Sequence, residues 1–119
     1  MASINKVILL GHVGKEPEVR YVDYGVAVAQ VSMATSERSY TLQNGTQVPE
    51  RTEWHRVVLW KQLAEFVEKY VHTGDCIYVE GKIQSRSYED KQGITRNITE
   101  IWGEKLELIS SKKDTANNG

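Results

Sequence analysis

The chain has 119 residues, 39% of them hydrophobic, which suits one compact domain that buries about two-thirds of its unfolded surface and excludes a second domain. Fifteen basic and sixteen acidic residues give a formal net charge of −1, which excludes binding of polyanions through overall positive charge. The single cysteine, Cys76, excludes an internal disulfide, and no apolar run is long enough for a signal peptide or a membrane span, so we expect a cytoplasmic protein.

The N-terminal part of the chain predicts a curved set of strands followed by a projection. Apolar and polar side chains alternate, Gly11 allows a bend, and Gly25 marks a turn. Residues 35–51 are polar and contain the tight-turn signal Asn44-Gly45, so we expect a protruding loop or hairpin there. The predicted strands cover residues 4–13 and 26–34, with a semi-alternating segment at 18–24 between them.

The segment WHRVVLW at residues 54–60 is the most informative stretch of the chain. Strand alternation gives one face the side chains of Trp54, Arg56, Val58 and Trp60, and the other face those of His55, Val57 and Leu59. Indoles stack on bases and a guanidinium meets phosphate, so the first face suits a sequence-tolerant platform for single-stranded nucleic acid. The alternative is a tryptophan-rich core strand, and from this stretch alone both interpretations stay open.

The second half of the chain predicts one helix and the remaining strands. Apolar residues first recur at helical spacing, and the helix is expected to stop near Gly74. Period-two alternation then indicates strands on both sides of a second polar projection. The expected segments are a helix at 63–71, strands at 76–83, 94–102 and 105–109, the projection at 84–96, and a polar, frayed tail at 110–119.

Three strands, a helix and two further strands are the element order of an oligonucleotide-binding (OB) fold. We therefore predict an all-β protein with one helix: a five-stranded Greek-key barrel, the helix between strands 3 and 4, and protruding β-hairpin loops. The barrel domain is expected to cover residues 1–109, with the tail at 110–119 outside it.

Patterns typical of catalysis or metal binding are missing. The histidines and the cysteine lack any recognised paired-ligand spacing, and no nucleophile or carboxylate cluster accompanies them. We therefore expect no enzymatic activity, no catalytic residues, no cofactor and no metal.

Several ordered segments resemble one family, the bacterial single-stranded DNA-binding proteins of the replication type. The matching segments run at nearly constant spacing from about residue 4 to 109. They are Asn5-Lys6-Val7-Ile8-Leu9-Leu10-Gly11, Pro17-Glu18-Val19-Arg20-Tyr21, Ala34-Thr35-Ser36-Glu37, Thr52-Glu53-Trp54-His55-Arg56-Val57-Val58-Leu59, Val79-Glu80-Gly81, Arg86-Ser87-Tyr88, and Arg96 with Thr99-Glu100.

The resemblance implies a homotetramer of OB barrels that wraps single-stranded DNA during replication, recombination and repair, in the cytoplasm at the nucleoid. It implies base stacking by Trp54, Trp60, Tyr88 and Tyr40, and a subunit interface at His55. Tyr stands at 40 and 88 where the family commonly has Trp, and Trp60 stands where Phe is familiar. The expected phosphate contacts are Arg56, Lys61, Lys82, Arg86, Arg96 and Lys6.

Family members usually continue into an acidic tip that recruits replication and repair proteins. This chain ends in Asn117-Asn118-Gly119, so such recruitment is expected to be reduced. The alternative functions are an OB-fold RNA-binding protein, a primosome adaptor, or a purely structural oligomeric barrel that buries Trp54 and Trp60 at an interface. Trp102 matches no family role, and packing against the helix or a neighbouring subunit is expected for it rather than base stacking.

Overall fold

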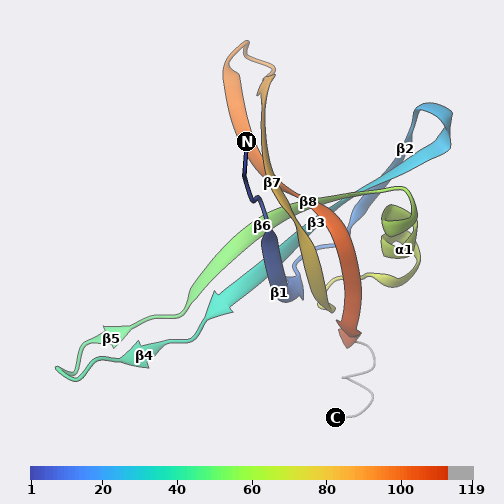
Figure 1. The fold of residues 1–119 in the computed structure, drawn as a ribbon. Coiled ribbons are helices and arrows are strands. Elements are labelled where there is room, and N and C mark those ends of the chain that lie inside the picture. The colour runs from blue at the N-terminus through green and yellow to red at the C-terminus, as the bar shows by residue number, and fades with distance from the viewer. Residues whose placement is uncertain (113–119) are drawn as a thin grey trace.

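The computed structural model describes residues 1–112 and shows a strongly bent sheet with a short helix at one side (Figure 1). Helix α1 (Gln62–Tyr70) follows the sixth strand, and a single 3₁₀ turn (Asp23–Gly25) joins the second strand to the third. The strands are β1 (Val7–Val13), β2 (Glu18–Val22), β3 (Val26–Glu37), β4 (Tyr40–Thr41), β5 (Gln47–Val48), β6 (Arg51–Trp60), β7 (Cys76–Glu89) and β8 (Thr95–Ser110).

Five of these strands close into a barrel. The order along the main sheet is β1-β7-β8-β6-β3-β2, and β1 also pairs with β3, which completes the ring. Only the β6–β8 contact is parallel among the strand pairs of the described residues. In chain order α1 lies between the third and fourth strands of this ring, so the predicted OB architecture is confirmed.

The barrel interior is filled by small and branched apolar side chains, because every second residue of the ring strands points inward. Gly11 is needed where β1 meets β3, since a Cβ there would overlap the carbonyl oxygen of Ala34. Helix α1 adds Ala64 and Val67 to the interior. The buried cluster comprises Val13, Ala27, Ala29, Val31, Met33, Val57, Leu59, Ala64, Val67, Val71, Ile77, Val79 and Ile101.

Three ribbons project from the barrel (Figure 1): β2 with the start of β3, the β4–β5 hairpin, and the outer halves of β7 and β8. The second predicted projection, 84–96, is present as a β-hairpin, in which β7 continues to Glu89 and β8 begins at Thr95. Its residues are exposed on both faces, so they lack the alternation by which strands are recognised. The two strands predicted at 94–102 and 105–109 are one strand with a bulge opposite Glu80 and Gly81.

The end of the described chain is attached to the barrel. Ser110 pairs with Cys76, and the backbone N–H of Lys112 donates to the buried carboxylate of Asp75 over 3.0 Å. The same carboxylate accepts from the backbone N–H of His72 at 2.8 Å. Of the tail predicted at 110–119, residues 113–119 lie outside the described residues, as does the chain end without an acidic tip.

Across residues 1–112 no helix is both long and apolar enough to cross a membrane. Over the same range no group of three or more His, Cys, Asp or Glu side chains is placed to hold a metal ion.

Candidate nucleic-acid interface

Strand β6 presents two different faces, and the alternation predicted for residues 54–60 is present. Val57 and Leu59 are completely buried in the barrel, whereas Trp54 on the other face is 59% exposed. Arg56 is exposed and Trp60 is half-buried on that same outward face. Strand β6 therefore divides between core packing and an open surface rather than serving as a tryptophan-rich core strand.

Strand register extends this outward face across the sheet. Residues directly opposite each other in a ladder share a face. Val58 of β6 lies opposite Trp102 of β8, which lies opposite Lys82 of β7. On the other flank Val58 lies opposite Gln30 of β3. The tryptophans of β6 and β8 and the cations of β6 and β7 therefore lie on one side of the sheet.

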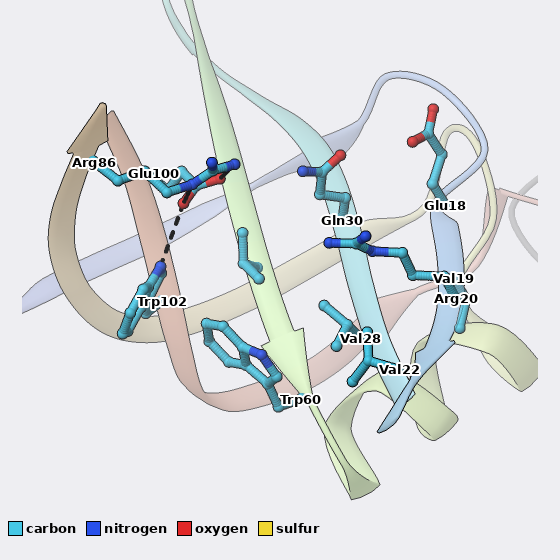
Figure 2. A pocket seen from close by; sticks show the side chains of 11 residues that line it. Glu18, Val19, Arg20, Val22, Val28, Gln30, Trp60, Arg86, Glu100 and Trp102 are labelled. Carbon is cyan, nitrogen blue, oxygen red and sulfur yellow. Dashed lines mark hydrogen bonds and ion pairs between the residues drawn. The ribbon is translucent and has the colours of Figure 1, made fainter. Parts of the chain in front are cut away.

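The outward face contains a trough with a volume of about 380 Å³ (Figure 2). Its floor includes Val28 and Val58, which are buried although they point away from the barrel interior. Figure 2 shows Arg86, Glu100 and Trp102 on one side, Glu18, Arg20 and Val22 on the other, and Trp60 between them. An apolar floor with a few convergent polar groups is typical of binding sites.

Trp60 and Trp102 form the aromatic part of the trough. Their ring centroids are 4.9 Å apart and their planes meet at 75°, an edge-to-face contact. The Lys82 ammonium lies 6.0 Å from the centroid of the Trp102 ring. The aromatic contact of Trp102 is with Trp60 on the outward face of the sheet rather than with the helix, and its packing against a neighbouring subunit stays a prediction.

Glu100 is a buried carboxylate in the middle of this cationic face, with only 3% of its surface exposed. Arg86 donates two hydrogen bonds to it, at 3.1 and 3.3 Å, and the indole N–H of Trp102 donates a third at 3.4 Å. Arg56 Nε lies 3.8 Å from Glu100 Oε2. Burial works to raise the pKa of Glu100, but the hydrogen bonds from Arg86 and Trp102 and the charges of both arginines together hold that pKa below its ordinary value.

A smaller cavity of about 190 Å³ lies beside the trough and includes Trp54, Lys15 and His55 in its lining. Glu18 and Gln30 line both spaces. Between them Arg56 donates a hydrogen bond to the side-chain oxygen of Gln30 at 3.1 Å. Trp54 and the Trp60–Trp102 pair thus belong to neighbouring cavities separated by an arginine. The ring of Trp54 also lies directly over Gly14, where a Cβ would overlap it.

The remaining predicted stacking and phosphate residues lie outside these two cavities. Tyr88 and Arg96 face each other across the outer β7–β8 hairpin, where Arg96 donates to Asp90 at 2.9 Å. Tyr40 is exposed on the separate β4–β5 hairpin. Lys61 is the N-cap residue before α1 and, with Trp60, lines a third cavity of about 550 Å³.

Lys6 contacts a different group of residues. Its ammonium is paired with Glu80 Oε1 at 2.7 Å, and the Tyr78 hydroxyl donates to the other oxygen of Glu80 at 2.6 Å. Glu80 lines neither of the two tryptophan cavities. The structure therefore does not bring Lys6 together with the other predicted phosphate contacts.

His55, the predicted interface residue, is half-buried within the single chain. Its Nε2 lies 2.8 Å from the hydroxyl oxygen of Thr35 on the neighbouring strand β3. The sequence predicted the tryptophans of β6 and the cations Arg56, Lys82 and Arg86. It did not predict that Trp102, Glu100, Gln30 and Arg20 belong to the trough. Alternation places Glu100 and Trp102 on one side of β8, but only the register with β6 shows which side that is.

The lowered pKa of Glu100 makes stability depend on pH on the acid side. A carboxyl whose pKa is lower in the folded than in the unfolded chain stabilises the fold above its ordinary value of 4.5 and loses that contribution as pH falls through the lowered value. We expect Glu100→Gln to reduce the drop in melting temperature between pH 7 and pH 3. Glu50→Gln, at an exposed loop position, is the control and should keep the full drop. An unchanged acid profile in Glu100→Gln would contradict this coupling.

Comparison with known proteins gives a consistent result. A family model described as the single-strand binding protein family matches residues 4–109. The chain is 57% identical over 110 residues to a single-stranded DNA-binding protein of Bacteroides thetaiotaomicron, covering 92% of this chain and 68% of that one. It is 42% identical over 114 residues to a single-stranded DNA-binding protein of Neisseria meningitidis serogroup A, covering 96% of this chain and 64% of the relative. The chain thus spans 68% and 64% of the length of these two relatives.

A solved structure, the Plasmodium falciparum SSB complex with ssDNA, superposes with a TM-score of 0.81 at 31% identity. The match covers 94% of this chain and 98% of that one. The likeness therefore includes the β-hairpin projections as well as the barrel.

Proposed function

This chain belongs to the single-strand binding protein family, and from that premise we propose that it binds single-stranded DNA without reading its sequence. The observation that carries the proposal is the outward face of β6, β7 and β8, on which Trp54, Trp60 and Arg56 lie beside Arg86 and Lys82. The proposed DNA-binding domain is the barrel, expected at residues 1–109, with β8 extending it to Ser110.

The chemistry of this face explains binding without sequence preference. Every base has a π face, so stacking on an indole contributes about 1 to 3 kcal/mol whatever the base. The cations that would contact phosphate are gathered on this one face, so the proposal is consistent with a net charge of −1 for the whole chain. Tyr88 with Arg96, and Tyr40, would extend the contacts along the two hairpins. Protection of single strands at the nucleoid in replication, recombination and repair is the corresponding role.

Titration with poly(dT) tests this function. We expect tryptophan emission to be quenched at low salt and the apparent affinity to fall as salt is raised. Poly(U) is the matched RNA polymer for comparison with poly(dT). An RNA-binding protein responds to the 2′-hydroxyl and should prefer poly(U). Unchanged emission with poly(dT) would contradict the stacking mechanism, and equal or tighter binding of poly(U) would favour the RNA-binding alternative.

Arg86 provides a test of the phosphate contacts. Its side chain is 51% exposed even though it is bonded to Glu100, so it is oriented by the protein and still accessible to phosphate. For single strands the slope of log affinity against log salt is about −0.7 per neutralised phosphate, so Arg86→Ala should make the slope shallower by about 0.7. Lys69→Ala on helix α1 is the control and should leave the slope unchanged. An unchanged slope in Arg86→Ala would remove Arg86 from the phosphate contacts.

We further propose that the protein is a homotetramer. Ile8 and Leu10 on β1 point away from the barrel and are 59% and 57% exposed. Exposed apolar side chains gathered on one strand suit contact with a second copy of the chain. His55 is proposed to contribute to a subunit interface as well.

A charge placed in this apolar patch should dissociate the assembly. We expect Leu10→Glu to reduce the mass measured by light scattering from that of four chains to a smaller species. Tyr24→Glu, at a fully exposed turn, is the control and should keep the full mass. A Leu10→Glu protein that remains tetrameric would show that the subunits meet elsewhere.

A further inference from the structure

Trp102 is a large aromatic side chain of the outward face to which the family resemblance gives no role. It is half-buried, so part of its ring is open to solvent. Its plane is inclined at 75° to that of Trp60, with the centroids 4.9 Å apart. Two nearly perpendicular indoles form a corner, which leaves aromatic surface directed into the trough that both residues line.

The trough beside this corner has the composition of a small-molecule site. Its volume is about 380 Å³, within the usual range for ligand pockets of roughly 300 to 1,000 Å³. Val28 and Val58 provide a buried apolar floor, and Arg20 and Arg86 lie on opposite sides of it (Figure 2). A flat aromatic ring therefore finds apolar contact below it, and a phosphate linked to that ring through a sugar finds a cation on either side.

Trp102 is held in place without any ligand. Its indole N–H donates to Glu100 Oε1 at 3.4 Å, and Glu100 is itself fixed by the two hydrogen bonds from Arg86. The polar edge of the indole is thus satisfied inside the protein, and its π surface remains for a ligand. Holding a side chain in its bound orientation reduces the entropy lost on binding.

We propose that this trough is a subsite for one nucleobase of the bound strand, with Trp102 as a stacking residue and Glu100 as the positioning residue that orients its indole. The inference rests on the proposed function, since the base is part of the single strand bound along β6. One base would lie at the Trp60–Trp102 corner, next to the cavity of Trp54. The Arg56–Gln30 hydrogen bond separates this base from the Trp54 cavity.

A protein with a single indole tests the contact directly. The variant Trp54→Phe/Trp60→Phe leaves Trp102 as the only tryptophan, because the chain has three. We expect oligo(dT) to quench its emission at the same DNA concentration that raises the anisotropy of a labelled oligonucleotide. Binding by anisotropy with unchanged Trp102 emission would overturn the subsite.

Affinity measurements separate stacking from simple packing. Trp102→Leu keeps an apolar side chain but removes the ring, so we expect an affinity about five- to 150-fold lower, equivalent to about 1 to 3 kcal/mol per base. Trp102→Phe should recover most of that loss. Tyr70→Leu, the same kind of change on α1, is the control and should bind as the wild type does. Wild-type affinity in Trp102→Leu would overturn the subsite, whereas failure of the wild type itself to bind poly(dT) would overturn the proposed function instead.

The direction in which DNA affinity changes tests the positioning role of Glu100. Glu100→Gln removes a negative charge from a face that meets phosphate, so charge alone predicts tighter binding. We expect weaker binding and a shifted emission maximum in the protein whose only indole is Trp102, because the amide cannot accept from Trp102 and Arg86 as the carboxylate does. Tighter binding with an unchanged emission maximum would show that Glu100 repels the DNA and does not position the indole.

Discussion

Replacing Leu59 by alanine is expected to lower the free energy of unfolding by about 3 kcal/mol, because the shortened side chain leaves a cavity that the barrel can fill only in part. Leu59 is completely buried. Its side chain occupies the space above Gly103 of β8, where a Cβ would overlap it. The expected loss of stability therefore has two sources. The removed methyl groups no longer contribute their burial in the core, and contacts between β6 and β8 are lost.

Urea unfolding at one protein concentration measures this effect, since unfolding of the proposed homotetramer would depend on concentration. Leu42→Ala is the matched control, because Leu42 lies on the β4–β5 hairpin and is 43% exposed. It should change stability by less than about 0.5 kcal/mol. Equal losses in the two variants would mean that Leu59 does not contribute to the core as its burial indicates.

Replacing Trp54 by alanine is expected to weaken binding of single-stranded DNA by about 1 to 3 kcal/mol with little loss of stability. The indole is 59% exposed and lies over Gly14, so its removal deletes a stacking surface and leaves the barrel interior intact. The slope of affinity against salt should not change, because no phosphate contact is lost.

Titration with oligo(dT) by anisotropy, alongside urea unfolding, checks both parts of this expectation. Tyr70→Ala is the control, since Tyr70 is 54% exposed but lies on α1 against Phe66. A Trp54→Ala protein with normal affinity, or one that unfolds as readily as Leu59→Ala, would contradict the division of β6 into a DNA face and a core face. The two variants change residues five positions apart on one strand. Leu59→Ala is expected to lose stability, whereas Trp54→Ala is expected to lose affinity for DNA.

Local sequence pattern was sufficient for most of the barrel. Alternation over residues 54–60 predicted that Val57 and Leu59 of β6 face the core. Helical spacing predicted α1, although its end was expected near Gly74 and the helix ends at Tyr70. The same rule did not predict the outer half of β7, because side chains from Gln84 onward are largely exposed on both sides of a free ribbon. A strand without a buried face carries no alternation in its sequence.

The site was predicted in part. Trp54, Arg56 and Trp60 are neighbours on one strand, so their shared face follows from local alternation. Arg86 and Lys82 join them only through the pairing of β7 with β8 and of β8 with β6. Lys6 carries the same charge, but its pairing with Glu80 depends on how β1 lies against β7.

By itself the sequence determined the succession of strands and helix along the chain, the two faces of β6 and the family, because all three depend on residue type and spacing along the chain. Only the tertiary structure decided that Trp102, Glu100 and Gln30 share a trough with Trp60. These residues come from three strands distant in sequence, and their side chains meet because the parallel β6–β8 pairing has that register. Shifting this pairing by one residue would turn Trp102 to the opposite face, so no local pattern on β8 alone specifies its role.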